Sequence, residues 1–94
     1  MITIIQYGSE TCAPCRAIRQ RITHWQQSHP DITYQYLPLE DHLEEAAQQG
    51  IFTVPTVLVT ADGREIARES GYFSLTGILQ QIERFQSLFG DSAE

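Results

Sequence analysis

Basic residues are scarce in this 94-residue chain, which has six lysine and arginine residues together against twelve aspartate and glutamate residues. The formal net charge is therefore -6 at pH 7. A phosphate backbone attracts a basic surface, so this balance disfavours a nucleic-acid-binding protein. The charge favours solubility and contacts with basic protein surfaces, but it carries no information on the fold.

Long hydrophobic runs are also absent. None approaches the ~18 apolar residues of a membrane-spanning helix, so we expect no membrane location. The first residues, Met1 to Gln6, have no basic segment, and their apolar run is too short for a secretory signal peptide. From these two observations we expect a cytoplasmic protein.

Internal repeats, linkers and low-complexity segments are missing as well. Hydrophobic residues make up 41% of the chain and charged residues 19%, which is typical of a soluble globular domain. We therefore expect a single domain over residues 1–90, followed by a frayed C-terminal tail at residues 91–94.

Cysteine is limited to two residues, Cys12 and Cys15. In a reducing compartment a lone pair is more often catalytic than structural, and so short a disulfide ring restricts the unfolded chain little. A zinc site uses about four ligands, and neither a second C-x-x-C nor a histidine at ligand spacing accompanies this pair. A redox role is thus favoured over a metal site, including one bridging subunits, and over an inert pair.

The segment around the cysteines is predicted to join a strand to a helix. Residues 2–7 form a short apolar, β-branched run, and apolar side chains recur at helical spacing after Cys15. Pro14 suits the first helical turn, where its missing N–H is not needed. The first N–H groups of a helix lack partners and carry partial positive charge, which stabilises a thiolate. We interpret Cys12 as the attacking thiolate and Cys15 as the resolving thiol.

The other elements are predicted from periodicity and turn residues. A strand, a helix and a second strand within so few residues indicate a βαβ unit with parallel strands and a right-handed crossover. The short turn at Asp62-Gly63 requires the two strands it joins to be antiparallel. After the C-x-x-C, we predict a helix to about residue 27, a strand at 32–37, a helix at 40–49, and strands at 56–60 and 65–70.

A final helix is predicted from the strongest periodicity in the chain. Ser74 is a suitable N-cap, and Phe73 and Ile78 are placed to form a hydrophobic staple. Gly90 can end this helix. The predicted apolar face consists of Leu75, Ile78, Leu79, Ile82, Phe85, Leu88 and Phe89.

Four landmarks, taken together and in order, resemble the thioredoxin superfamily. The extra N-terminal strand and helix of full-length thioredoxins are absent, so the order βαβ-α-ββα is similar to a minimal, glutaredoxin-sized core. The resemblance implies an α/β thioredoxin-like fold with a four-stranded mixed sheet, strand order 2-1-3-4, and helices on both faces. The landmarks are Cys12-Ala13-Pro14-Cys15, Val54-Pro55-Thr56, Asp62-Gly63 and Gly71.

The resemblance also implies a substrate groove beside the cysteines. Val54–Pro55 would be a cis peptide that faces them and turns the backbone of Val54 outward. That backbone can pair with an extended client segment, like a short added strand. Gly71 and Tyr72 would form the other wall of the groove. The remaining substrate contacts implied are Thr11, Ala13 and Pro14.

The chain departs from thioredoxins behind the cysteine pair. The buried carboxylate expected on the first strand falls on Gln6, and its usual lysine partner falls on Tyr36. Because Gln6 cannot exchange a proton, Cys15 would have to be activated in another way, through water or by Glu10. The other departures are Thr11 in place of a tryptophan and Ala13-Pro14 in place of Gly-Pro.

The resemblance implies an enzyme, a thiol–disulfide oxidoreductase that reduces protein disulfides, with roles in electron transport and cell redox homeostasis. We expect no metal and no cofactor beyond the redox-active disulfide Cys12–Cys15. The expected partners of this monomer are client proteins with disulfides, and a thioredoxin reductase or glutathione as electron donor. Two alternatives stay open. One is a glutathione-linked reductase, although Gly71-Tyr72-Phe73 replaces the glutathione-holding residues of glutaredoxins; the other is a binding module that uses the dithiol as a redox sensor.

Overall fold

A central sheet organises the molecule in the computed structural model, which describes residues 1–90. Its strand order is β2-β1-β3-β4. Strand β1 (Ile2–Gly8) runs parallel to β2 (Thr33–Pro38) and antiparallel to β3 (Thr56–Ala61), and β4 (Arg64–Ser70) is antiparallel to β3. The predicted order and directions of the strands are therefore confirmed.

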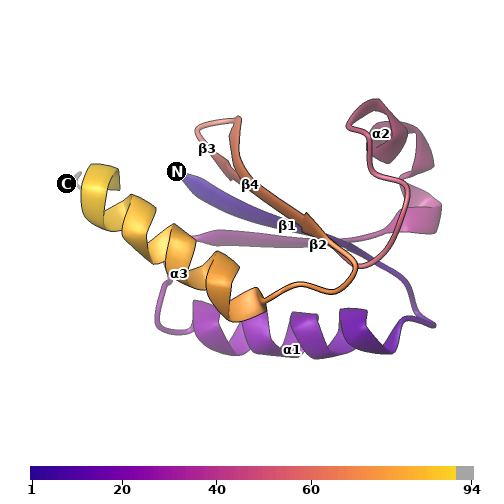
Figure 1. Ribbon diagram of the computed structural model, residues 1–94, viewed down its shortest axis with the longest axis horizontal. Coiled ribbons are helices and arrows are strands. Elements are labelled where there is room, and N and C mark those ends of the chain that lie inside the picture. Colours follow the sequence, from indigo (N-terminus) through magenta and orange to yellow (C-terminus); the bar gives the residue numbers. More distant parts are fainter. Residues whose placement is uncertain (91–94) are drawn as a thin grey trace.

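Helices cover both faces of this sheet (Figure 1). Helices α1 (Ala13–Gln26) and α3 (Leu75–Phe85) lie on one face, and α2 (Leu43–Gln48) lies on the other. Alternate residues of each strand point to opposite faces, so the sheet has two hydrophobic clusters. The larger one includes Ile4, Ile22 and Ile82 beneath α1 and α3, and the smaller one includes Tyr7 and Leu58 beside α2.

The turn between β3 and β4 has the geometry that its sequence predicts. Asp62 and Gly63 have φ values of 52° and 85°. Two consecutive positive φ values fit the twist of a tight hairpin, and Asp-Gly adopts them readily. The N–H of Asp62 donates to the carbonyl of Met1 at 2.9 Å, so the turn also contacts the start of β1.

The predicted helix at residues 40–49 is wrong in its extent. A 3-10 turn at Leu39–Asp41 precedes α2, and the two are separated by His42, whose φ of -139° and ψ of 33° are not helical. Only Ala46 is buried in this segment. With so little apolar surface to bury, packing does not select one continuous helix.

The predicted apolar face of the last helix is also too long. Ser74 caps α3 as expected, since its Oγ accepts from the N–H of Gly77 at 3.0 Å. The α-helix ends at Phe85, however, and Gln86–Gly90 is π-helical. Leu88 and Phe89 are 68% and 69% exposed, and the ring of Phe89 lies against that of Phe85. The predicted tail at 91–94 lies outside the described residues.

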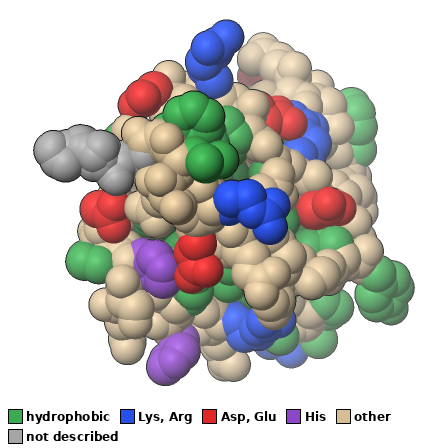
Figure 2. Space-filling model, turned by 60° about the vertical axis from the view of Figure 1, so that its left-hand side comes forward, with side chains coloured by type: hydrophobic (Ala, Val, Ile, Leu, Met, Phe, Trp, Pro, Cys, Tyr) green, Lys and Arg blue, Asp and Glu red, His purple; other side chains and the backbone are tan. Residues whose placement is uncertain are grey.

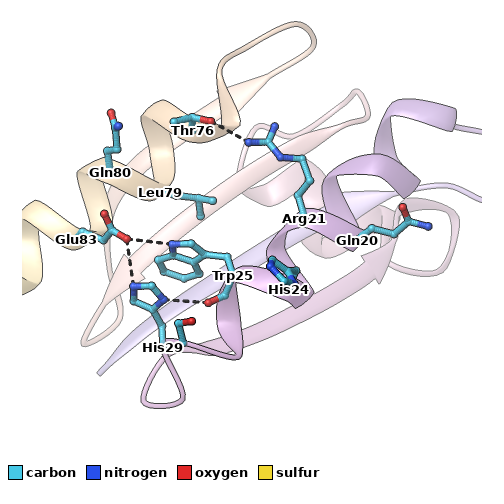
Figure 3. Close-up of a pocket in the computed structure, with 10 residues that line it drawn as sticks. Gln20, Arg21, His24, Trp25, His29, Thr76, Leu79, Gln80 and Glu83 are labelled. Atoms are coloured by element: carbon cyan, nitrogen blue, oxygen red, sulfur yellow. Dashed lines mark hydrogen bonds and ion pairs between the residues drawn. The ribbon is translucent and has the colours of Figure 1, made fainter.

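Polar contacts of Glu83 join α3 to the C-terminal end of α1 and the turn that follows it (Figure 3). Glu83 accepts a hydrogen bond from the indole N–H of Trp25 at 3.2 Å and lies 3.2 Å from Nε2 of His29. The rings of Trp25 and His29 are stacked with centroids 3.8 Å apart. A hollow of about 640 Å³ lies beside these residues, and its lining includes no residue of the cysteine segment.

The charged side chains are mixed in sign over the end of the molecule shown in Figure 2. Acidic, basic and histidine side chains alternate there with hydrophobic ones. Within residues 1–90, no helix combines the length and the apolar character needed to cross a membrane.

Arg68 connects β4 to the end of α2. Its guanidinium donates to the carbonyl of Gln49 at 2.8 Å and to both carboxylate oxygens of Glu65 at 3.0 and 2.9 Å. The hydrogen bond from Arg68 holds the pKa of Glu65 below its ordinary value of 4.5. A carboxyl group with a lowered folded-state pKa stabilises the fold above its ordinary pKa, and this contribution is lost as pH falls through the folded-state pKa.

Replacing Arg68 with glutamine should therefore lower the free energy of unfolding by about 1 kcal/mol or less near pH 7, because this pair is partly exposed. The deficit should shrink, without vanishing, as the solution is acidified through the range in which Glu65 titrates. Urea denaturation of both proteins at neutral and acid pH measures it, with Arg64→Gln as a control on the same strand. A deficit that is independent of pH would contradict the role of Glu65.

Candidate active site

The two cysteines lie at the N-terminal end of α1, at the right of Figure 1. Cys12 is the N-cap of the helix, and Cys15 follows within the first turn. Their Cα atoms are 5.2 Å apart, and their sulfur atoms are joined in a disulfide. Cys15 is fully buried, whereas Cys12 is only partly buried. Cys12 is therefore the more accessible of the two residues.

The end of α1 favours negative charge on Cys12. The backbone N–H of Cys15 donates to Sγ of Cys12 at 3.1 Å, so this sulfur occupies the capping position. The first turn contains no acidic residue that would oppose the positive end of the helix dipole. Such a position stabilises a thiolate when the disulfide is reduced. Pro14 lies in the first turn, as predicted.

The segment between β1 and α1 is ordered by its own hydrogen bonds. The N–H of Thr11 donates to Oγ of Ser9 at 3.1 Å, and the N–H of Cys12 donates to the carbonyl of Ser9 at 3.2 Å. Arg16 donates to the carbonyl of Glu10 at 2.9 Å, which places a cation beside this segment. Thr11, Ala13 and Pro14 are all exposed around Cys12.

The sheet brings two further segments to the same edge as the cysteines. Thr56, at the start of β3, pairs with Tyr7 near the end of β1 and with Ser70 at the end of β4. The residues that precede β3 and follow β4 therefore emerge at the edge where β1 leads into the cysteine segment. This register places the segments 53–55 and 71–72 at the end of the sheet from which residues 9–12 emerge.

The two segments are joined to each other by a backbone hydrogen bond. The N–H of Gly71 donates to the carbonyl of Pro55 at 3.0 Å, and the Val54–Pro55 peptide bond is cis. Pro55 is buried, while Tyr72 is fully exposed. Among residues 1–90, neither the N–H nor the C=O of Val54 takes part in a backbone–backbone hydrogen bond. Neither group is therefore used in the sheet or in the turns that flank it.

Behind the disulfide, Gln6 occupies a fully buried position on β1. Its side-chain N–H donates to the carbonyl of Cys15 at 2.9 Å, and its side-chain oxygen accepts from the hydroxyl of Tyr34. The sequence alone shows a glutamine at position 6 where thioredoxins carry a carboxylate, but it does not show that Tyr34 is the hydrogen-bond partner of this glutamine. Tyr34 lies on β2 two residues before Tyr36, and this alternation is the only sequence signal that both rings share one face.

Tyr36 occupies the space next to the end of β1. The guanidinium carbon of Arg19 lies 4.2 Å from the centre of its ring, a cation–π contact. A Cβ added at Gly8 would lie 2.5 Å from the hydroxyl oxygen of Tyr36 and 2.7 Å from a ring carbon. Gly8 is thus required for the close approach of this ring. In residues 1–90, no three His, Cys, Asp or Glu side chains are grouped so that they could hold a metal ion.

Comparisons with known proteins agree with this geometry. The Thioredoxin family model matches residues 1–84. A thioredoxin from Chlamydia caviae is 22% identical over 83 residues, which are 88% of this chain and 81% of that protein. A thioredoxin-2 from Pyricularia oryzae is 27% identical over 63 residues, which are 67% of this chain but only 37% of that longer protein.

A solved structure extends the likeness to the whole fold. Thioredoxin 1 from the thermophilic eubacterium Thermosipho africanus superposes with a TM-score of 0.84 at 27% identity. The superposition covers 92% of this chain and 96% of that chain. Sequence and fold therefore give the same classification.

Proposed function

The chain belongs to the thioredoxin family of thiol–disulfide oxidoreductases, and we propose that it reduces the disulfides of client proteins through Cys12 and Cys15. The observation that carries this proposal is the asymmetry of the pair. Cys12 caps the helix and is only partly buried, and Cys15 is fully buried in the first turn. This arrangement suits a nucleophile and a resolving thiol, respectively.

In the proposed reaction, the Cys12 thiolate attacks one sulfur of a client disulfide. The client S–S bond breaks, and the released client thiolate takes up a proton, leaving a mixed disulfide between Cys12 and the client. Cys15 then loses its proton and attacks Sγ of Cys12. The bond from Cys12 to the client breaks, and the second client sulfur leaves and is protonated. Two electrons and two protons thus pass to the client, and the Cys12–Cys15 disulfide remains.

The proposed client groove runs across the edge of the sheet beside Cys12. The free N–H and C=O of Val54 are suited to pair with an extended client strand. The carbonyl of Pro55 accepts from the N–H of Gly71, and this hydrogen bond fixes the backbone of Val54 relative to residues 71–72, the other side of the proposed groove. The remaining proposed contacts are the exposed side chains Thr11, Ala13, Pro14 and Tyr72.

We further propose that a thioredoxin reductase, rather than glutathione, returns electrons to the pair, in a cytoplasmic setting where the protein supports electron transport and redox homeostasis as a monomer. The family classification and the absence of glutaredoxin-type residues at 71–73 support this choice. The described residues 1–90, with their continuous sheet, support a single domain.

The test is a turnover assay with insulin as the disulfide substrate and catalytic amounts of the protein. We expect multiple turnovers with thioredoxin reductase and NADPH, slower or no turnover with glutathione, and only the uncatalysed rate for Cys12→Ser. Reduction limited to one equivalent per protein under every donor would instead favour the redox-sensing module. Efficient turnover with glutathione alone would favour the glutathione-linked reductase.

A further inference from the structure

We infer that Tyr34 is a positioning residue for the resolving half of the reaction, and that it acts through Gln6 on the backbone of Cys15. This inference rests on the proposed function, because it concerns the step in which Cys15 attacks Cys12. It goes beyond that function by assigning a role to a side chain on β2, outside the cysteine segment and the client groove.

Two consecutive hydrogen bonds connect three elements of the fold. The hydroxyl of Tyr34 on β2 donates to Oε1 of Gln6 on β1, and Nε2 of Gln6 donates to the carbonyl of Cys15 on α1 at 2.9 Å. Gln6 and Cys15 are both fully buried. A buried amide that lost either partner would carry the full cost of its desolvation, so these bonds specify one orientation of Gln6.

The carbonyl of Cys15 belongs to the first turn of α1, next to the sulfur that must move against Cys12. A carbonyl oxygen has two lone pairs, so it can accept from Gln6 and still take part in the helix. Gln6 thereby fastens the first turn to the central strand. Tyr34 fixes the Gln6 amide in the orientation that does this, because its hydroxyl meets the amide oxygen and leaves the amide N–H directed at Cys15.

This connection is uncharged. Gln6 has no proton to exchange, and burial raises the pKa of Tyr34 to about 12. The charged and titratable groups that act on Tyr34 are Arg19 from α1, whose cation lowers its pKa, and Tyr36 from β2. β1 contributes Ile4 and Gln6 on this face, and β3 contributes Val57 and Val59, none of which titrates.

No group behind Cys15 on this path accepts its proton at a pH at which thiols react. The proton of Cys15 therefore does not leave along this path, and the departing client sulfur is a group that needs one. In the resolving step, the Cys15–Cys12 bond forms, the Cys12–client bond breaks, and one proton passes from Cys15 to the client sulfur. The two hydrogen bonds from Tyr34 through Gln6 set the position of Cys15 but take no part in this proton transfer.

The two half-reactions separate when the reduced protein reacts with 5,5′-dithiobis(2-nitrobenzoate). Attack by Cys12 releases one coloured thiolate, and attack by Cys15 on the mixed disulfide releases the second. We expect Tyr34→Phe to slow the second release by about tenfold to a hundredfold, since small displacements of a reacting group have effects of this size. The first release should be unchanged. The matched control is Tyr36→Phe, because the side-chain hydrogen bonds of Gln6 within residues 1–90 go to Cys15 and Tyr34, and it should leave both releases unchanged.

The pH profile of the second release distinguishes positioning from a general loss of structure. Tyr34→Phe should lower the rate by the same factor at every pH, whereas Gln6→Glu should add an inflection that neither the natural protein nor Tyr34→Phe shows. Equal slowing of both releases, no slowing in Tyr34→Phe, or an inflection of the natural protein that disappears in Tyr34→Phe would each overturn the inference. Absence of any second release in the natural protein would instead overturn the proposed function itself.

Discussion

Replacing Cys15 by serine is expected to leave Cys12 joined to its client in a stable mixed disulfide. The first attack needs only the accessible Cys12 thiolate, so it should proceed. The second needs a sulfur nucleophile behind Cys12, and a serine hydroxyl is too weakly acidic to replace it. Turnover with insulin and reductase should therefore fall to the background rate, while an adduct of one client chain per protein accumulates. Non-reducing electrophoresis and intact-mass spectrometry measure this adduct.

The matched variant is Cys12→Ser, which should form no adduct although it has the same composition. Its remaining thiol, Cys15, is fully buried, so a client disulfide cannot reach it in the folded protein. Equal activity of the two single variants, or an adduct that forms on Cys15 instead, would reverse or abolish the assignment of roles. A thiol reductant added afterwards should release the client from Cys15→Ser, which shows that the linkage is a disulfide.

Replacing Ile22 by alanine is expected to produce the largest loss of stability among single changes in α1. Ile22 is fully buried and belongs to the cluster that also contains Ile4, Val57 and Ile82. Its side chain packs α1 onto the sheet, and deleting it removes buried methyl groups and leaves a cavity. Such substitutions lower the free energy of unfolding by about 2–5 kcal/mol, a large part of the roughly 5–15 kcal/mol of a small domain.

Urea denaturation followed by circular dichroism measures this loss. Thr23→Ala, at the exposed neighbouring position, is the control and should change the free energy of unfolding by about 0.5 kcal/mol or less. Comparable effects of the two changes would show that α1 does not depend on this contact. If Ile22→Ala stays folded at low temperature, its attack on a client disulfide should be retained, because Ile22 lies about two helical turns after Cys15 on α1.

The local features of the site were predictable because they depend on short stretches of sequence. The position of Cys12 at a helix start follows from an apolar run, a helical periodicity and Pro14 within one turn. The Asp62-Gly63 turn follows from two residues that accept positive φ. The family resemblance then supplied the strand order, which no periodicity contains.

Other features depend on tertiary contacts and were missed. The hydrogen bond from Tyr34 to Gln6 is set by the register of β2 against β1, and the two residues are distant in sequence. The predicted continuous helix at 40–49 is wrong because that segment buries almost no apolar surface. The predicted buried face of the last helix is too long because Leu88 and Phe89 remain exposed. Spacing predicts where an apolar face points, but only the surrounding elements decide whether that face is buried.

The central claim is that the N-terminal end of α1 stabilises the thiolate of Cys12, while Cys15 stays buried until it attacks the mixed disulfide. Alkylation of the reduced protein with iodoacetamide over a range of pH, with mass spectrometry to locate the label, tests it most directly. We predict that Cys12 is labelled rapidly below the ordinary ionisation range of cysteine, about pH 8.5, and that Cys15 is labelled only after denaturation. Labelling of both cysteines at similar rates, with the pH dependence of a free thiol, would contradict the claim.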